Sequence, residues 1–256
     1  MNTTAPHLTR LNTLVVIPAF NEEATVSHVL KELLSSDFQV LLVCDGCTDG
    51  TADVGRSLNV SVLELPINLG VGGALRAGFK YAVRHGFEAV VQVDADGQHP
   101  ISELPNLIEA ANQRSAHLII GSRFLSLQDP IWISRIRRIA TSVLAWSASS
   151  AAGCRITDSS SGFRLVRRPL LEQFAARLAN NYLGDTHEAL VSAGRAGYSV
   201  TEIVVEMRPR QSGVSTASNR SAFGFTIKCL CVWLLGMHKR FESVQTLTST
   251  DRVQSG

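Results

Sequence analysis

Two carboxylates and an amide follow an apolar run in the first half of the chain. Residues 89–93 are apolar apart from one glutamine and lead directly into Asp94, Asp96 and Gln98, an Asp-x-Asp motif with an amide behind it. Such a run predicts a buried strand, with the three side chains on the loop that follows it. Oxygen ligands of this kind suit Mg²⁺ or Mn²⁺, particularly where a diphosphate supplies the remaining ligands. A turn in which the aspartates only cap backbone amides is the alternative, and the motif alone does not decide between the two.

Three more polar segments also follow predicted strands. They are residues 18–23, 45–51 and 68–73, and residues 94–99 make the fourth of the set. Because the carboxyl ends of parallel strands meet at one edge of an open sheet, and ligands bind beyond that edge, we expect the four segments to converge on one site.

The elements that must position these segments alternate along the first two-thirds of the chain. β-Branched runs predict strands at residues 13–17, 40–43, 60–65, 89–93 and 117–120, with a later strand at 200–207. Segments of helical period predict helices at residues 22–36, 49–58, 72–85, 105–114, 131–152, 169–178 and 185–194. This alternation predicts an α/β fold with a parallel sheet and crossover helices. No repeat or flexible linker interrupts residues 1–216, which we expect to form one folding unit.

The composition is that of an ordinary globular protein. Of 256 residues, 45% are hydrophobic and 18% charged, which excludes a disordered or collagen-like chain. The formal net charge of +2 lacks the basic excess of a general nucleic-acid binder, so nucleic acid is not expected as a partner. The five cysteines and a polar N-terminal segment without an apolar core predict a reduced, cytoplasmic location.

The order and content of the polar segments resemble the inverting family 2 glycosyltransferases of the GT-A fold. Residues 121–124, 157–164 and 207–215 extend the resemblance, which is most similar to polyprenyl-phosphate glycosyltransferases of the dolichyl-phosphate mannose synthase type. The resemblance spans about residues 13–216. It implies a single Rossmann-like, mostly parallel sheet flanked by helices. It also implies transfer of a hexose, with inversion, from a GDP- or UDP-sugar to polyprenyl phosphate.

The resemblance also implies which residues form the donor site. The implied donor contacts are Pro18, Ala19, Phe20, Glu22, Asp45, Gly72, Asp94, Ala95, Asp96 and Arg210. The implied ligands of a Mg²⁺ or Mn²⁺ ion are Asp96 and Gln98. The chain departs from the family at Thr216, where a lysine is common, which puts the donor role of Arg210 in doubt.

A second departure is the pair Cys44-x-x-Cys47. The family often has an acid at the first of these positions and a serine at the second, so the preferred nucleotide stays open. The pair also permits a redox or zinc site. The other three cysteines offer no matching spacing, and we therefore favour substitution by a small residue.

Arginines are expected at the acceptor. A phosphate acceptor is already ionised, so the protein must hold two anions together rather than remove a proton. The planar fork of arginine pairs with two phosphate oxygens and keeps its charge. The resemblance places Arg123 and Arg138 at the acceptor phosphate, and with Asp96 they are the expected catalytic residues.

Two other functions remain open from the sequence. A family 2 enzyme acting on a hydroxyl acceptor, a glycan or a lipid, would need a general base, for which Asp185 and Glu188 are the candidates. Their alternative role is to complement the dipole of a helix N-terminus. The third possibility is a protein that binds a nucleotide sugar without turnover.

The C-terminal tail, residues 217–256, is expected to be amphipathic. Its apolar residues recur at spacings of three and four: Phe223, Ile227, Leu230, Leu234, Met237 and Phe241. With basic residues on both sides, this pattern predicts a helix lying in a membrane interface. A coiled-coil seam and packing on the catalytic domain are the alternatives. We therefore expect a peripheral protein at the cytoplasmic face of the membrane, which contacts the bilayer surface or a small membrane subunit.

Overall fold

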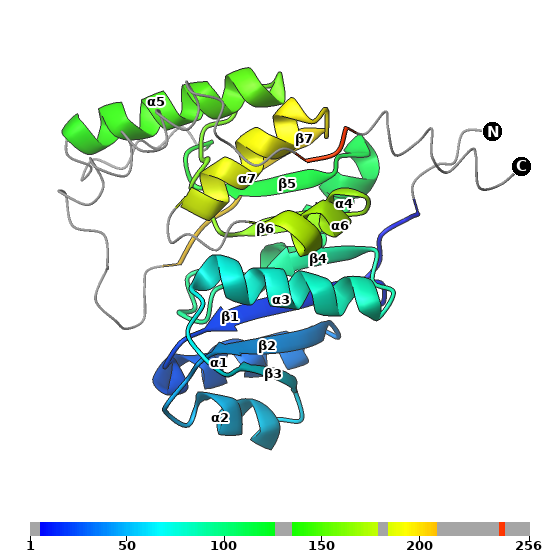
Figure 1. Cartoon of the computed structure of the whole chain (residues 1–256), viewed down its shortest axis with the longest axis vertical. Coiled ribbons are helices and arrows are strands. Elements are labelled where there is room, and N and C mark those ends of the chain that lie inside the picture. Colours follow the sequence, from blue (N-terminus) through cyan, green and yellow to red (C-terminus); the bar gives the residue numbers. More distant parts are fainter. Residues whose placement is uncertain (1–5, 126–134, 179–183, 209–240, 244–256) are drawn as a thin grey trace, which may run out of the picture.

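The protein has one mixed sheet with helices on both faces (Figure 1). The computed structural model describes residues 6–125, 135–178, 184–208 and 241–243, apart from the side chains of residues 135–141, 184 and 185. The strands are β1 (Thr13–Ala19), β2 (Gln39–Asp45), β3 (Ser61–Leu65), β4 (Ala89–Gln92), β5 (Leu118–Ser122), β6 (Arg164–Arg167) and β7 (Val200–Val204). Their order in the sheet is β3-β2-β1-β4-β6-β5-β7, and β6 alone among them runs antiparallel to its neighbours.

The helices divide between the two faces. They are α1 (Glu23–Leu34), α2 (Thr51–Ser57), α3 (Val71–Arg84), η1 (Ile101–Glu103), α4 (Leu104–Arg114), α5 (Arg135–Ala152), α6 (Leu170–Arg177) and α7 (Gly184–Arg195). The apolar residues of α1, α2 and α4 pack on one face, and those of α3, α5, α6 and α7 on the other. The predicted α/β class with a mostly parallel sheet is therefore confirmed.

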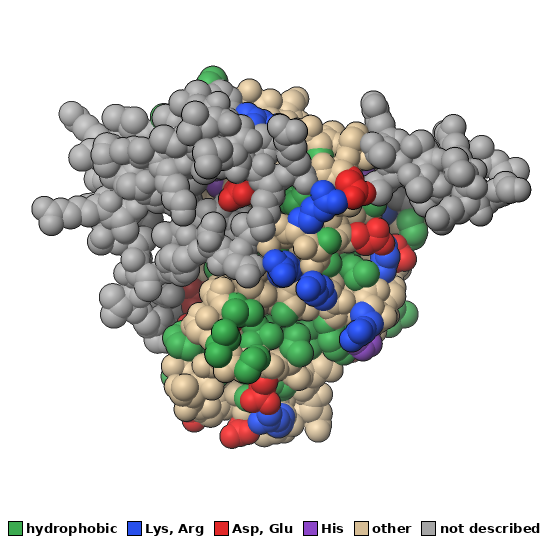
Figure 2. Space-filling model, in the orientation of Figure 1, with side chains coloured by type: hydrophobic (Ala, Val, Ile, Leu, Met, Phe, Trp, Pro, Cys, Tyr) green, Lys and Arg blue, Asp and Glu red, His purple; other side chains and the backbone are tan. Residues whose placement is uncertain are grey.

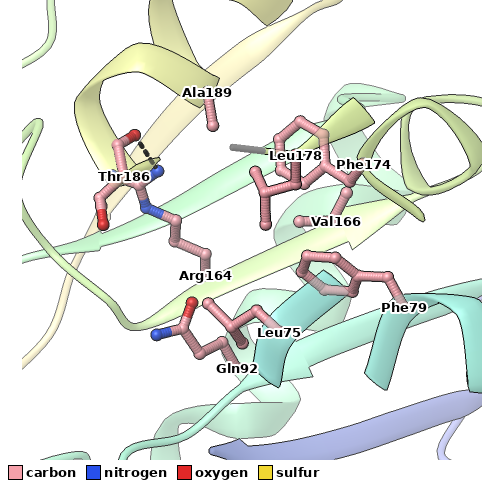
Figure 3. Close-up of a pocket in the computed structure, with 9 residues that line it drawn as sticks. All are labelled: Leu75, Phe79, Gln92, Arg164, Val166, Phe174, Leu178, Thr186 and Ala189. Carbon is pink, nitrogen blue, oxygen red and sulfur yellow. Dashed lines mark hydrogen bonds between the residues drawn. The ribbon is translucent and has the colours of Figure 1, made fainter. Parts of the chain in front are cut away.

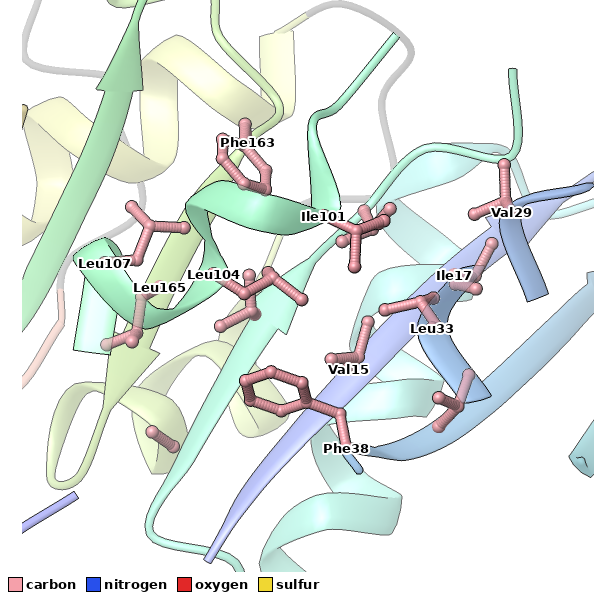
Figure 4. Packing of buried hydrophobic residues seen from close by; sticks show 14 of the residues in the cluster. Val15, Ile17, Val29, Leu33, Phe38, Ile101, Leu104, Leu107, Phe163 and Leu165 are labelled. Carbon is pink, nitrogen blue, oxygen red and sulfur yellow. The ribbon is translucent and has the colours of Figure 1, made fainter. Parts of the chain in front are cut away.

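Side chains of β1 point alternately to the two faces of the sheet, so this one strand contributes to both hydrophobic cores. Val15 and Ile17 are fully buried on the α1 and α4 side, where Figure 4 shows them among Leu33 and Leu104. Val16 points to the opposite core, under α3. Because successive side chains of a strand point to opposite faces, a strand covered on both sides is apolar throughout.

The strand β6 was not among the predicted elements. It has only four residues, and buried arginines stand at both of its ends, Arg164 and Arg167. The segment is too short, and its apolar and polar residues do not alternate, so the sequence does not predict a strand there. It pairs antiparallel with β4 and β5, so that Leu165 faces Val91 on one side and Ile119 on the other. A return strand thus separates the first half of the sheet from the second.

The other predicted elements occur with shifted ends. The expected strand at residues 200–207 ends at Val204 and the one at 117–120 continues to Ser122, while the helix expected at 131–152 is described from Arg135 onward. Shifts of this size are usual, because end residues depend on caps and tertiary contacts.

Most of the tail lies outside the described residues, including the expected amphipathic helix, so the division near residue 216 stays a prediction. Of its apolar residues only Phe241 is described. It is 8% exposed, and its ring centroid lies 5.5 Å from that of Phe174 in α6. Beside it Glu242 pairs with Arg177 at 2.5 Å. Across the described ranges, no helix combines the length and the apolarity needed to cross a bilayer.

Candidate active site

The ends of β1, β2, β3 and β4 bring the four predicted polar segments to one edge of the sheet. We call residues 18–22, 45–46, 67–72 and 94–98 the carboxyl edge. Asp45 ends β2, is 3% exposed, and accepts the backbone N–H of Leu69 through Oδ1 at 2.8 Å. Gly46 has φ +69°, and a Cβ there would lie 2.5 Å from the backbone nitrogen of Asn68. Only glycine allows this close approach, which fixes the 67–69 segment against Asp45.

The loop after β1 is bonded to the loop after β2. The N–H of Glu22 donates to the hydroxyl of Thr51 at 2.9 Å, and the N–H of Thr48 donates to Asn21 Oδ1 at 2.9 Å. Glu22 itself is the N-cap of α1, and its Oε2 accepts the hydroxyl of Thr25 at 2.6 Å. The first two segments are therefore held together by side chain to backbone bonds rather than by ion pairs.

Apolar side chains are exposed along this polar edge. Phe20 is 48% exposed, Ile67 63% and Leu69 39%. Ile67 and Leu69 were not singled out in the sequence, where nothing distinguishes them from core residues. Exposed apolar surface beside a buried carboxylate offers both a contact face and a hydrogen-bond acceptor for a flat polar ring.

Asp94 is oriented by two neighbouring side chains. Gln92 Nε2 donates to Asp94 Oδ1 at 3.2 Å. His99 is buried; its Nδ1 accepts the N–H of Asp94 at 2.9 Å, and its Nε2 lies 3.4 Å from Asp94 Oδ2. Because a backbone N–H is always the donor, this geometry assigns the ring proton to Nε2, facing the carboxylate. Gly162 leaves room there, since a Cβ added at this position would lie 3.0 Å from Gln92 Nε2 and 3.2 Å from Asp94 Oδ2.

Asp96 is compatible with both interpretations of the acidic motif, the turn and the cation site. It is 9% exposed, and its Oδ1 accepts the N–H of Gln98 at 3.0 Å, as the turn interpretation expects. Among the described residues, no three His, Cys, Asp or Glu side chains come together as a cation site. The oxygen donors of Asp96 and Gln98 fit a hard cation only where phosphate oxygens complete its coordination, which is the usual manner of Mg²⁺ binding.

Arg123 stands at the end of β5 and pairs with a buried carboxylate. Its Nε and Nη2 donate to the two oxygens of Asp158 at 2.8 and 3.0 Å, and Nη2 also donates to Ser160 Oγ at 3.2 Å. The side chain of Asp158 is fully buried, whereas that of Arg123 is 43% exposed. Burial favours a higher pKa for Asp158, but the bonds from Arg123 outweigh it and lower the pKa.

This pairing changes how Arg123 can bind an anion. The sequence predicts that the fork pairs with two phosphate oxygens, but Asp158 already occupies the Nε and Nη2 edge. Among the described residues, Nη1 has no hydrogen-bond partner and is the nitrogen left for a ligand. Burial favours a lower pKa for Arg123, but Asp158 and, to a smaller extent, Asp94 outweigh it and raise the pKa, so the arginine and the acidic loop border one site.

Two acids of the site were missed in the sequence. Asp158 lies within the 157–164 motif, where no role was given to it, and Glu202 lies in β7. Glu202 is 8% exposed and accepts the N–H groups of Thr157 and Asp158. An acid in the middle of a short strand, followed by two β-branched apolar residues, was the available signal. We call residues 122–123, 157–161 and Glu202 the arginine corner.

The remaining predicted site residues differ in how far they can be placed. Gly72 is buried in the first turn of α3, Ala95 is 4% exposed, and Pro18 and Ala19 belong to β1. Arg138 lies in α5, but its side chain, like that of Asp185 in α7, is outside the described part, as is all of Arg210. Glu188 is half-buried in α7.

A small cavity lies behind the site, between β6, α3, α6 and α7 (Figure 3). Its volume is about 20 Å³, enough for one water molecule and far too small for a sugar. Arg164 and Gln92 line its polar end, and Arg164 donates to the carbonyl oxygens of Thr186, Ser159 and Ser161 at 2.6 to 2.8 Å. The buried Arg164 side chain therefore links α7 to the arginine corner through hydrogen bonds.

The two cysteines next to the carboxyl edge, Cys44 and Cys47, are poorly suited to metal or redox chemistry. Burial, with the neighbouring Cys47, raises the pKa of the Cys44 thiol to about 12. Cys47 donates through Sγ to the carbonyl of Ala19 at 3.3 Å. A reactive or zinc-binding cysteine needs the opposite, a lowered thiol pKa. The geometry favours small side chains that pack beneath the edge.

Comparison with known proteins gives the following similarities. The model of the family described as Glycosyl transferase family 2 matches residues 14–174. The polyprenol monophosphomannose synthase of Mycolicibacterium smegmatis is 32% identical over 220 residues, 80% of this chain and 81% of that protein. The undecaprenyl-phosphate mannosyltransferase of Micrococcus luteus is 28% identical, covering 92% of this chain and 98% of that one. Glucosyl-3-phosphoglycerate synthase from Mycobacterium tuberculosis, solved with Mn²⁺, uridine diphosphate and phosphoglyceric acid, aligns with a TM-score of 0.66 at 20% identity, over 91% and 80% of the two chains. At that identity the structural match shows a shared fold.

Proposed function

Because the chain has the GT-A fold and belongs to glycosyl transferase family 2, we propose that it transfers a hexose, with inversion, from a GDP- or UDP-sugar to polyprenyl phosphate. The observation that carries the proposal is the position of Arg123, an arginine held beside the acidic loop at the carboxyl edge. The names of two relatives, a polyprenol monophosphomannose synthase and an undecaprenyl-phosphate mannosyltransferase, support the acceptor class.

The carboxyl edge is the proposed donor site. Asp45 accepts hydrogen bonds from the nucleobase with the oxygen not used by Leu69, and Phe20 covers one face of the ring. Pro18, Ala19 and Glu22 line the nucleoside, and Gly72, Asp94 and Ala95 lie at the ribose and diphosphate. Arg210 is a further proposed diphosphate contact.

Asp96 and Gln98 are the proposed holders of a Mg²⁺ or Mn²⁺ ion that also contacts the donor diphosphate. The bound ion neutralises charge on the leaving nucleoside diphosphate. The Mn²⁺ in the M. tuberculosis structure supports a divalent ion without distinguishing between the two metals. The chain's own contribution is to hold Asp96 in place, because the bond from the Gln98 N–H fixes its carboxylate.

The acceptor phosphate binds at the arginine corner. An ionised phosphate needs no general base, and Nη1 of Arg123 offers it a charged donor, with Arg138 proposed as a second contact. Asp158 is badly placed to act as a base for a hydroxyl acceptor, because its carboxylate is fully buried and both of its oxygens accept bonds. Asp158 is therefore excluded as that base, and Asp185 and Glu188 stay the candidates for a hydroxyl-acceptor enzyme.

We further propose that the chain works at the cytoplasmic face of a membrane as a peripheral protein. A polyprenyl chain is confined to the bilayer, so the enzyme must reach the bilayer surface. Figure 2 shows basic side chains gathered beside an apolar area on the face that α3 and α6 cover. Lys80, Arg84 and Arg177 are exposed on those two helices. Sedimentation with anionic vesicles, but not with neutral ones, is the expected result.

The decisive experiment supplies each radiolabelled nucleotide sugar with polyprenyl phosphate and Mn²⁺. One donor is expected to give a lipid-linked product, and a chelator is expected to abolish its formation. Label in a glycan or lipid hydroxyl product would favour the hydroxyl-acceptor enzyme. Donor binding by calorimetry without consumption in any lipid extract would favour a binding protein. Either result refutes the proposed reaction.

A further inference from the structure

Glu202 is a buried acid that the proposed reaction does not use. It lies on β7, the edge strand beside β5, where it pairs in register with Ile120. Its side chain is 8% exposed, and burial raises its pKa despite the bonds that it accepts. A buried carboxylate costs free energy unless hydrogen bonds compensate for its lost hydration, so its partners indicate what it is for.

The partners of Glu202 belong to one turn. Both carboxylate oxygens lie 2.8 Å from the backbone nitrogen of Thr157, and Oε1 also lies 2.8 Å from that of Asp158. Oε2 accepts the Thr157 hydroxyl at 2.9 Å, and that hydroxyl lies 2.8 Å from Ser122 Oγ at the end of β5. The carboxylate therefore fixes two consecutive N–H groups, and through them the place where the Asp158 side chain begins.

Asp158 in turn leaves Arg123 little freedom. It accepts Nε and Nη2 of that side chain, and Ser160 Oγ donates to Asp158 Oδ1 at 3.0 Å. A long side chain that is ordered before its ligand arrives loses less conformational entropy on binding. The chain of contacts runs from β7 through the turn to β5, between segments that are 44 and 35 residues apart.

We infer that Glu202 is a positioning residue for the acceptor anion: by fixing the Thr157–Asp158 turn, it makes Asp158 hold Arg123 with Nη1 left for the phosphate. The identity of the anion rests on the proposed function, whereas the contacts that position Arg123 do not depend on it. Glu202 itself touches no reacting group.

Glu202→Gln tests the contact with the smallest change of shape. Because both oxygens lie 2.8 Å from the nitrogen of Thr157, the NH₂ group faces that N–H in either orientation of the amide. Glu206→Gln is the matched control, since Glu206 is an exposed acid just beyond the same strand. The first readout is the NMR signal of the Arg123 Nε–H, assigned by its absence in Arg123→Lys. Slow solvent exchange of this proton is expected in the unaltered chain and in Glu206→Gln, and fast exchange in Glu202→Gln.

Kinetics supply the second readout. Glu202→Gln is expected to raise the KM for polyprenyl phosphate by roughly 3- to 10-fold, the factor for ordering one long side chain on binding. The KM for the nucleotide sugar and the affinity for the nucleoside diphosphate should stay unchanged. In the Arg123→Ala background the same substitution should have no further effect, because contacts in series are not additive.

Two results would overturn the inference. One is slow solvent exchange of the Arg123 Nε–H in Glu202→Gln. This result would overturn the inference even if the chain transfers no sugar. The other is an Arg123→Ala, Glu202→Gln double variant in which the KM for polyprenyl phosphate rises by the product of the two single fold-changes. Fast Nε–H exchange in Glu202→Gln, combined with no lipid-linked product from the unaltered chain, would instead count against the proposed function alone.

Discussion

The carboxyl edge and the arginine corner border the same site but are built differently. At the carboxyl edge, loops are joined by single hydrogen bonds, and Asp94 and Phe20 remain substantially exposed. At the arginine corner, two buried acids and one arginine form a continuous network in which both acids accept several hydrogen bonds. A donor that brings its own phosphates and cation can complete a partly open surface. An acceptor that offers little besides one anionic group needs a surface that is already in place.

The two regions also differ in how the chain assembles them. The carboxyl edge comes from consecutive strand and helix units within the first 98 residues of the sequence. The arginine corner joins the end of β5 and the middle of β7 with a turn that precedes β6. We therefore expect changes at the carboxyl edge to act on catalysis with little effect on the fold. Changes at the arginine corner should act on acceptor binding through neighbouring residues.

The largest effect is expected from Asp96→Asn at the carboxyl edge. The amide keeps an oxygen for the Gln98 N–H but loses the charge that holds a cation. We expect kcat to fall by about 10²- to 10³-fold, as when one electrostatic contact to a transition state is removed, with the melting temperature unchanged. Radiolabel transfer and circular dichroism measure the two. Asp53→Asn, on an exposed residue of α2, is the control. Transfer within twofold of the unaltered enzyme would refute a catalytic carboxyl edge.

Arg123→Lys tests the arginine corner. An ammonium group keeps the charge but cannot make both bonds to Asp158 and still present a nitrogen to the acceptor. We expect kcat/KM for the acceptor to fall by roughly 10- to 100-fold, the range for losing a hydrogen bond to a charged group. Arg84→Lys, exposed on α3, should change nothing. If the donor KM rose as much as the acceptor KM, the separation of the two regions would be wrong.

Low pH should destabilise the region around α7, the helix that Arg164 links to the arginine corner. His187 of α7 is 3% exposed, its Nε2 lies 3.2 Å from Ser147 Oγ in α5, and burial, with Arg164, lowers its pKa from 6.5 to about 4. Between these values the unfolded chain binds a proton that the folded chain does not. Stability is therefore complete above pH 6.5 and falls as the pH drops toward 4, by about 1.4 kcal/mol per unit.

Thermal unfolding across this pH range measures the effect. In His187→Gln the slope of stability against pH should become shallower, whereas His85→Gln, on an exposed residue, should leave it unchanged. An identical slope in all three proteins would mean that His187 does not govern the acid response.

The smallest effect is expected from Cys47→Ser, next to the carboxyl edge. A serine hydroxyl can still donate to the carbonyl of Ala19, as the thiol does. Transfer and stability should stay within about twofold and 0.5 kcal/mol of the unaltered enzyme, as for most substitutions away from critical contacts. Loss of stoichiometric zinc or a tenfold drop in rate would instead show that the cysteine pair has a chemical role.

The carboxyl edge could be predicted from the sequence to a large extent. Each run is mostly apolar and a polar segment follows it closely, so strand ends and loop residues such as Asp45 and Asp96 are local properties of the chain. What the local pattern left open was contact between loops. The bond from Leu69 to Asp45 and the exposure of Ile67 appear only after the strands are aligned.

The arginine corner could not be predicted in the same way. The sequence marked Arg123 but not its partner, because Asp158 is 35 residues away and its role depends on full burial. Glu202 resembles an ordinary strand residue until β7 pairs with β5 and buries it. The sequence by itself determined the α/β fold and the polar edge, since periodicity and strand ends are encoded locally. Only the tertiary structure decided which acids hold the arginine, because burial and long-range pairing set the free energy of a charge.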